Sequence, residues 1–318
     1  MSKLNLGLYW AASCGGCEIA VVELREKILD LDATANIVFW PVAVDVKYKD
    51  VEAMPDGFMD ACLFNGAIRT SENEEMAHLL RRKAKVLVAF GSCAHEGCIP
   101  GLANLFTREE ILNRVYREVP SVDNPEGILP QRKTQVPEGE LEIPEFYRTV
   151  RTLGQTVDVD YYVPGCPPQA HQIWAVIEAI LAGTLPPRGS VVGAYDKTVC
   201  DECKLVREER KIKHFYRPHE IIPEPGRCLL DQGIICAGPA TRSGCGALCT
   251  SVGLPCRGCY GPPPNVVDQG AALLSAVASV VDADTEEEAA RIVNEIVDPV
   301  GTFYRFGLPA SLLHRRKT

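Results

Sequence analysis

Long apolar runs are absent from this sequence. No stretch approaches the roughly 20 uninterrupted apolar residues that a membrane-spanning helix needs. The first residues also lack the charged segment, the apolar segment and the paired arginines of export signals. Basic residues are outnumbered, with 33 Lys and Arg against 42 Asp and Glu, which argues against general nucleic-acid binding. We therefore expect a cytoplasmic protein with no membrane span and no nucleic-acid partner.

Cysteine, in contrast, is abundant, with 14 residues in 318. In a reducing cytosol many cysteines indicate metal ligands or redox centres rather than a disulfide framework. Twelve of them fall into two groups with the spacing of metal ligands, and two remain outside. Cys62 lies inside a predicted strand, where we expect a buried structural thiol. Cys98 is surplus to the sets of four, and we expect a free thiol.

The first region, residues 1–195, has the pattern of an α/β domain. The predicted strands are 4–10, 37–43, 61–65, 85–90 and 157–163. The predicted helices between them are 17–31, 72–84, 108–117 and 170–181. Several strands are almost continuously apolar, as expected for strands that are buried on both faces. Alternation of strands and helices predicts a doubly wound, parallel sheet.

Two segments break this alternation. Residues 119–145 contain five prolines and little periodicity, which predicts an inserted surface loop. Residues 196–264 contain eight cysteines interleaved with Gly and Pro, and no regular period. We expect this irregular second region to lack an ordinary apolar core and to depend on bound metal for its order. The third region, 265–318, returns to helical patterns at 266–281 and again from Thr285.

Four cysteines of the first region follow predicted strands. Cys14 and Cys17 come after the first strand, and Cys93 and Cys166 each lie just past the end of a later one. The loops beyond the carboxyl ends of parallel strands share one edge of the sheet, so the four thiols converge there. The Cys-x-x-Cys pair alone also fits a thioredoxin-type dithiol. Four thiolates fit either a cubane iron-sulfur cluster or a tetrahedral zinc ion.

The eight cysteines of the second region are enough for two more four-thiolate sites. They are Cys200, Cys203, Cys228, Cys236, Cys245, Cys249, Cys256 and Cys259. Spacing does not settle how they divide, although residues 245–259 are compact enough to form one site. Paired Cys-x-x-Cys segments are also typical of structural zinc. A row of redox clusters explains all three sites by one purpose, which is electron conduction.

These motifs, in this order, resemble the small subunit of nickel-iron hydrogenases. The resemblance rests on Cys14 to Glu18, on the turn around Cys93, on the Pro-Gly-Cys-Pro-Pro turn around Cys166 and on the later cysteines, and it covers about residues 4–260. It implies a flavodoxin-like domain with a proximal cluster on Cys14, Cys17, Cys93 and Cys166. It also implies a medial cluster on Cys245, Cys249, Cys256 and Cys259, and a distal cluster on Cys200, Cys203, Cys228 and Cys236. The implied order of electron flow is proximal, medial, distal.

Two residues depart from the familiar periplasmic members of this family. Cys200 stands where those enzymes have a histidine, and Cys249 offers a fourth medial thiolate. The resemblance therefore implies three 4Fe-4S clusters. It is closest to the cytoplasmic, methyl-viologen-reducing hydrogenases of methanogens, which do not reduce the deazaflavin coenzyme. It implies a separate large subunit that carries the nickel-iron site, with no catalytic residue here. A small iron-sulfur adaptor subunit and the heterodisulfide reductase or ferredoxin system are the implied electron acceptors.

Three other interpretations stay open at this point. The deazaflavin-reducing sister enzyme has a similar small subunit. A respiratory-complex subunit at the quinone site resembles only the α/β half, typically has adjacent cysteines, and lacks the eight later ones. A zinc protein that binds a partner through its cysteine-rich region is the third. Glu18, next to Cys17, fits either a proton relay beside the proximal cluster or an acid in the first turn of a helix.

Overall fold

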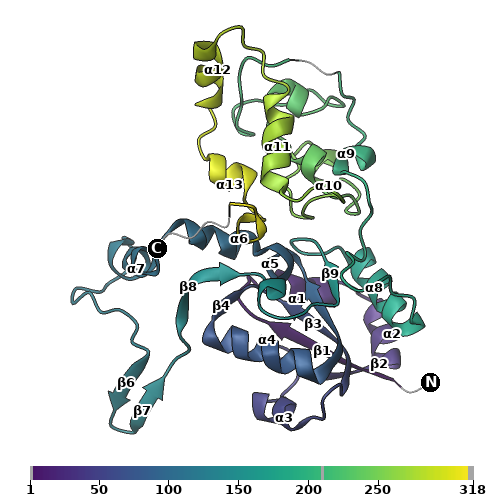
Figure 1. The fold of residues 1–318 in the computed structure, drawn as a ribbon, viewed down its shortest axis with the longest axis vertical. Coiled ribbons are helices and arrows are strands. Elements are labelled where there is room, and N and C mark those ends of the chain that lie inside the picture. The colour runs from purple at the N-terminus through teal and green to yellow at the C-terminus, as the bar shows by residue number, and fades with distance from the viewer. Residues whose placement is uncertain (1–2, 209–210, 314–318) are drawn as a thin grey trace.

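Five parallel strands form the centre of the computed structural model, which describes residues 3–208 and 211–313 (Figure 1). Their bounds are β1 Leu4–Trp10, β2 Ala35–Phe39, β3 Met59–Asn65, β5 Ala84–Phe90 and β9 Tyr161–Val163. Their order across the sheet is β2-β1-β3-β5-β9, and every neighbouring pair is parallel. This is the flavodoxin-like order of a doubly wound sheet. The predicted α/β fold is therefore confirmed, and each predicted strand overlaps an observed one.

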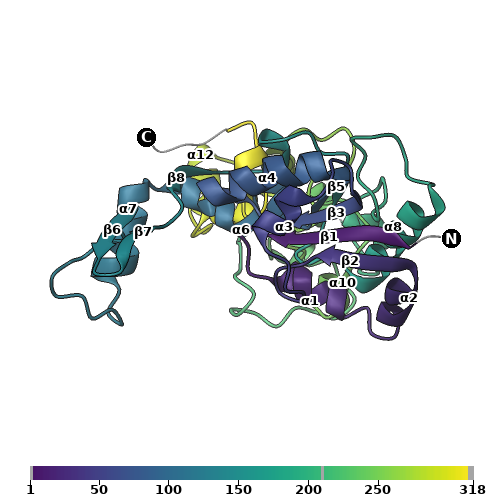
Figure 2. The ribbon, with the colours of Figure 1, turned by 90° about the horizontal axis from the view of Figure 1, so that it is seen from below.

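Helices cover both faces of this sheet (Figure 2). They are α1 Gly16–Val22, α2 Lys27–Thr34 and α8 Ala170–Ala182 on one face, and α3 Tyr48–Ala53 and α4 Ser71–Lys83 on the other. Strand residues alternate between two buried clusters, so that Leu8 packs toward α1 and α8 while Tyr9 packs toward α4. Both faces being apolar explains the nearly continuous apolar strands.

The structure differs from the predicted helix 17–31, which is broken into α1 and α2. The break lies at Arg25, whose φ of +58° is in the left-handed region, so the helical hydrogen bonds cannot continue through it. Beyond the sheet, short helices lead away from β5. They are α5 Ser92–Glu96, α6 Cys98–Gly101 and α7 Arg108–Asn113.

The predicted surface loop at 119–145 contains a hairpin. Strands β6 Lys133–Val136 and β7 Gly139–Glu142 pair antiparallel and extend away from the rest of the molecule (Figures 1 and 2). Their side chains are almost all exposed, so the apolar alternation that identifies a half-buried strand is missing from the sequence. A second small sheet, of β4 Ile68–Thr70 and β8 Phe146–Arg151, joins this segment to α4.

The second and third regions share one apolar core. Leu273 and Val277 of α11 pack in the same cluster as Val199, Leu230 and Cys236. The helices of this part are α9 Val199–Glu202, α10 Leu248–Ser251, α11 Gln269–Ala278, α12 Glu286–Val293 and α13 Pro299–Phe303. The expectation that the cysteine-rich region lacks an ordinary core is thus wrong, because helices from residues 269–303 complete it. The three-part division of the chain remains a prediction.

Within residues 3–208 and 211–313, no helix is both long and apolar enough to cross a membrane.

The packing of α4 on the sheet gives a stability prediction. Leu80 is fully buried there, whereas Leu29 on α2 is 71% exposed. We expect Leu80→Ala to lower the free energy of unfolding by about 2–5 kcal/mol, because it leaves a cavity in the core. Leu29→Ala is the matched control and should change it by less than about 0.5 kcal/mol. Urea unfolding followed by circular dichroism measures both, and equal losses would contradict the assigned packing.

Candidate metal centres

The four cysteines of the first region lie at the carboxyl edge of the sheet. Cys14 and Cys17 follow β1, Cys93 lies in α5 directly after β5, and Cys166 follows β9. Burial, followed by the neighbouring thiols of Cys93 and Cys166, raises the pKa of Cys17 far above its usual range. The structure therefore brings together the four thiols that the strand positions predict. Cys17 and Cys93 are buried, while Cys14 and Cys166 are exposed.

Glycine makes this close approach possible. A Cβ atom added at Gly91 would lie 2.4 Å from the Sγ of Cys17, and Gly91 has a φ of +82°. Any side chain at this position would displace the thiol and strain the backbone. The loops are also tied to one another, because the Ser92 amide donates to the Gly165 carbonyl at 2.8 Å and the Gly165 amide donates to the Ser92 hydroxyl at 3.2 Å.

A fifth thiol lies beside this set. The Sγ of Cys98 is 3.7 Å from the Sγ of Cys166, and Cys98 is fully buried. The sulfur contact with Cys98 lowers the pKa of Cys166 to about 7. Cys98 has a φ of +47°, which is unusual for a residue with a side chain. The sequence alone leaves Cys98 as surplus, because only the fold brings it to Cys166. Cys62, in contrast, is a fully buried thiol of β3, as predicted.

Four cysteines of the second region line one cavity. They are Cys200, Cys203, Cys228 and Cys236. The rest of the wall is mainly apolar, with Val199, Leu205, Leu229 and Leu230. Burial and the three neighbouring thiols raise the pKa of Cys200 to about 12. A Cβ atom at Gly238 would be 3.0 Å from the Sγ of Cys200, so this wall is also close to the sulfur atoms.

The other four cysteines gather between this cavity and the sheet. Burial, and then the thiols of Cys166, Cys245 and Cys249, raise the pKa of Cys259 to about 12. Burial also raises the pKa of Cys256, and the thiols of Cys236 and Cys259 raise this pKa further. These four residues are therefore neighbours in space as well as in sequence.

The three sets of cysteines touch one another in order from the sheet outward. The hydroxyl of Ser92, next to Cys93, donates to the carbonyl of Cys259. The amide of Cys256 donates to the Sγ of Cys236 at 3.3 Å. The first contact joins the sheet edge to the middle set, and the second joins the middle set to the cavity.

The donor chemistry of each set fits an iron-sulfur cluster. Each offers four thiols, and amides point at several sulfur atoms, such as that of Gly16 at 3.4 Å from the Sγ of Cys14. Thiolate ligands with hydrogen bonds to sulfur are the usual environment of such clusters. Among the described residues, no three His, Cys, Asp or Glu side chains converge closely enough to hold a single metal ion.

Glu18 is buried beneath the first set. The indole of Trp40 donates to its carboxylate, and the amide of Asn65 donates to it at 3.3 Å. Burial raises the pKa of Glu18. It does lie in the first turn of α1, as one interpretation expects, but it also has specific partners at the ends of β2 and β3.

Two titratable residues behind Cys93, the buried Glu96 and the partly buried His95, are not indicated by the sequence. Burial raises the pKa of Glu96 to about 8 and lowers the pKa of His95 to about 4. A Cβ atom at Gly261 would lie 2.2 Å from Glu96, so the carboxyl group fills the junction between the two halves. Nothing in the local sequence distinguishes Glu96 from an exposed helical glutamate.

Comparison with known families agrees with this geometry. Residues 14–180 match the family described as "NADH ubiquinone oxidoreductase, 20 Kd subunit". The match covers four of the five strands of the sheet, β2, β3, β5 and β9, together with the edge cysteines, and it ends before the eight later cysteines.

Two curated relatives extend over both halves. The F420-non-reducing hydrogenase iron-sulfur subunit of Archaeoglobus profundus is 41% identical over 98% of this chain and 98% of its own length. The corresponding F420-non-reducing hydrogenase subunit of Methanothermobacter marburgensis is 36% identical over 98% of this chain and 96% of its own.

Solved structures agree at the level of the fold. A chain of an NAD+-reducing NiFe-hydrogenase is 29% identical with a TM-score of 0.50, covering 58% of this chain and 94% of that one. A chain of the NiFeSe hydrogenase of Desulfovibrio vulgaris Hildenborough has a TM-score of 0.51 at 14% identity, covering 89% of this chain and 99% of that one. At this identity the likeness shows only a shared fold. The sequence identity of 41% and 36%, over 98% of this chain, shows that it belongs to the iron-sulfur small-subunit family of the F420-non-reducing hydrogenases. It is thus a small subunit of an oxidoreductase.

Proposed function

We propose that this chain conducts electrons from H2 oxidation on a separate nickel-iron large subunit to an electron-accepting partner. Three 4Fe-4S clusters, when bound, would supply one-electron transfer along the chain. In this proposal the proximal cluster is held by Cys14, Cys17, Cys93 and Cys166, the medial one by Cys245, Cys249, Cys256 and Cys259, and the distal one by Cys200, Cys203, Cys228 and Cys236.

The observation that carries the proposal is the order in which the three sets of cysteines contact one another. The proximal set meets the medial set through Ser92 and Cys259, and the medial set meets the distal set through Cys256 and Cys236. Structural zinc would need no such sequence of contacts, because each zinc stabilises its own surroundings. A series of neighbouring redox sites is what electron conduction requires.

The proximal end supports contact with the large subunit. The exposed Cys14 lies between β1 and α1, and these two elements carry Trp10, Ile19 and Val22, which are 40%, 59% and 54% exposed. An apolar surface of this kind favours a stable protein interface. Glu18 lies beneath it, buried and hydrogen-bonded, where it can hold a proton beside the interface.

The relatives' names support the choice of acceptor. Because they are F420-non-reducing hydrogenases, we favour the heterodisulfide reductase and ferredoxin system, reached through a small iron-sulfur adaptor subunit, over the deazaflavin coenzyme. The eight later cysteines, which the match to the respiratory-complex family does not reach, argue against a quinone-site subunit.

The purified complex should contain nickel, and three four-iron clusters in this chain. Its broad visible absorption should bleach with dithionite and with H2. A colourless protein with about three zinc ions, as four-thiolate structural sites would hold, would refute electron conduction.

The medial ligand set is tested by Cys249→Ala. Removing one of four thiolates should convert this cluster to a three-iron form, which electron paramagnetic resonance detects. Ser251→Ala is the control, since Ser251 lies on the same helix α10 and is exposed. A spectrum of Cys249→Ala that equals the control would show that Cys249 is not a ligand.

The space around the proximal set is tested by Gly91→Ala. We expect the loss of one cluster of three and of H2-driven reduction, because the methyl group would displace the Cys17 thiol. Gly183→Ala is the control: Gly183 also has a positive φ, of +64°, but no atom lies within 4 Å of its added Cβ. Iron analysis measures the loss of a cluster. Reduction with dithionite shows whether the remaining clusters still accept electrons when H2-driven reduction is lost. Equal iron in both variants would show that the close approach at Gly91 is not required.

A further inference from the structure

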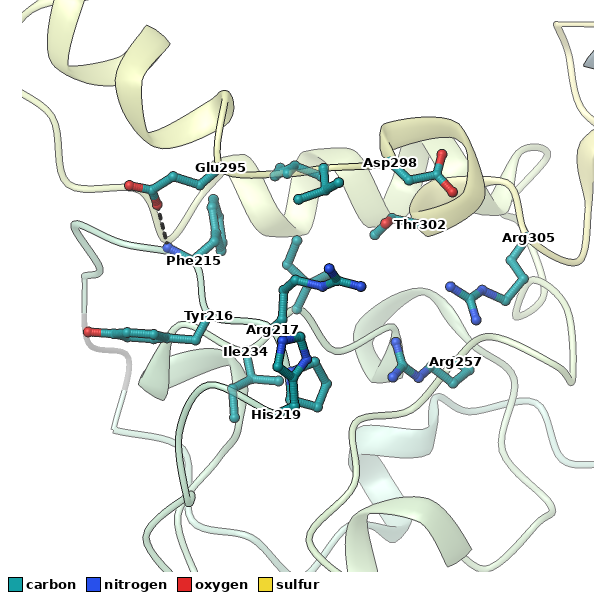
Figure 3. Close-up of a pocket in the computed structure, with 14 residues that line it drawn as sticks. Phe215, Tyr216, Arg217, His219, Ile234, Arg257, Glu295, Asp298, Thr302 and Arg305 are labelled. Carbon is teal, nitrogen blue, oxygen red and sulfur yellow. Dashed lines mark hydrogen bonds between the residues drawn. The ribbon is translucent and has the colours of Figure 1, made fainter.

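A basic pocket lies in the second half, away from the sheet (Figure 3). It has a volume of about 530 Å³ and is lined by Arg217, His219, Arg257 and Arg305 together with apolar residues such as Ile234 and Ile296. Figure 3 shows the guanidinium groups of Arg257 and Arg305 on one side of the pocket, with Arg217 reaching into the same space.

Both carboxylates that line this pocket already have partners within this chain. The carboxylate of Glu295 pairs with His214 at 2.8 Å and with Arg291 at 3.3 Å. The carboxylate of Asp298 accepts from the amide of Gly301 at 2.9 Å, at the start of α13. Within residues 3–208 and 211–313, the ion pairs of the structure include none from Arg217, Arg257 or Arg305, and the Nε of Arg305 donates to the carbonyl of Gly301 at 3.0 Å. The pocket is therefore positive, although the chain as a whole has a formal charge of −9.

Like charges also lie close together here. The guanidinium groups of Arg257 and Arg305 line the same side of this pocket (Figure 3). Two cations held near each other repel one another, and an anion between them would relieve the repulsion. This arrangement favours a negatively charged occupant.

An apolar groove continues from the pocket. It has a volume of about 260 Å³, shares Phe215 and Ile296 with the pocket, and is lined only by apolar side chains and Tyr304. Leu274 and Val293 on its wall are 52% and 51% exposed, and Val297 at the pocket is 73% exposed. A basic pocket with an exposed apolar border fits a protein surface better than a small ion.

The pocket lies against two of the candidate metal centres. Arg257 stands between Cys256 and Cys259 in the chain, and Ile234 and Ile235 lead directly into Cys236. A protein seated here would approach both the medial and the distal sets through only a few residues.

We propose that this pocket and its apolar border are the docking site for an acidic, apolar-bordered surface of the electron-accepting protein. The proposal rests on the function proposed above. Arg217, Arg257 and Arg305 attract carboxylates of the partner, and the neighbouring groove receives its apolar side chains. Attraction of this type raises the association rate and weakens with salt.

The test uses the purified complex of this chain with its large subunit and clusters. H2-dependent reduction is followed with two acceptors, an acidic ferredoxin and propylsulfonate viologen, which has no net charge. The variant is the double substitution Arg217→Glu and Arg305→Glu, since both residues lie outside the candidate cluster ligands. Arg82→Glu, on the exposed side of α4, is the control with the same change of charge at one site.

We expect the ratio of kcat/KM for ferredoxin to kcat/KM for the viologen to fall about tenfold in the double variant at low ionic strength, because electrostatic steering is lost. The difference should shrink as salt is added. Arg82→Glu should keep the ratio of the unmodified complex to within about twofold, since Arg82 lies on α4, in the other half of the molecule from the pocket (Figure 1).

Other outcomes overturn the proposal. An unchanged ratio in the double variant refutes docking at this pocket, while reduction of the viologen leaves the conduction function intact. An equal fall in Arg82→Glu would show a general charge effect instead. An unchanged ratio together with saturable binding of inorganic phosphate, measured by calorimetry and lost in the double variant, would assign the pocket to a small anion. Failure of H2 to reduce either acceptor in the unmodified complex would count against the proposed function itself.

Discussion

The parallel pairing of β1, β5 and β9 with their neighbours is the constraint on which the rest of the structure depends. In a parallel sheet all carboxyl ends lie at one edge, so the residues that follow three different strands meet there. Cys17, Cys93 and Cys166 are separated widely in sequence and become neighbours only through this geometry. The second half then packs on the same edge, where Ser92 contacts Cys259. Every later site is positioned relative to this first one.

Gathering thiols in this way has an electrostatic cost. Burial and mutual proximity raise the pKa values of Cys200 and Cys259 to about 12. Without a positive partner these residues stay protonated at neutral pH. Metal ligation requires thiolates, so cluster binding must release protons and supply the charge that stabilises them. The apolar wall of the cavity around Cys200 is therefore suited to a bound cluster and poorly suited to free thiolates.

Much of the fold and part of the site could be predicted from the sequence. The strands of the sheet have a clear apolar pattern, and the position of Cys93 and Cys166 just past strand ends indicates the shared edge. Other features depend on contacts that no local pattern records. The approach of Gly91 to Cys17, the contact of Cys98 with Cys166 and the burial of Glu96 all follow from how loops pack. The hairpin of β6 and β7 has no signal in the sequence, because its side chains are exposed on both faces.

The packing of Phe306 has a consequence for the biosynthesis of this protein. Phe306 lies in one cluster with Cys93 and Cys98, and its carbonyl accepts from the Cys98 amide at 2.8 Å. Translation makes the sheet and its edge cysteines long before it makes this residue. A nascent chain therefore leaves Cys93 and Cys98 uncovered by Phe306 until the ribosome has added this residue. The burial of these two thiols is thus completed only near the end of synthesis, by a residue more than 200 positions further along the chain.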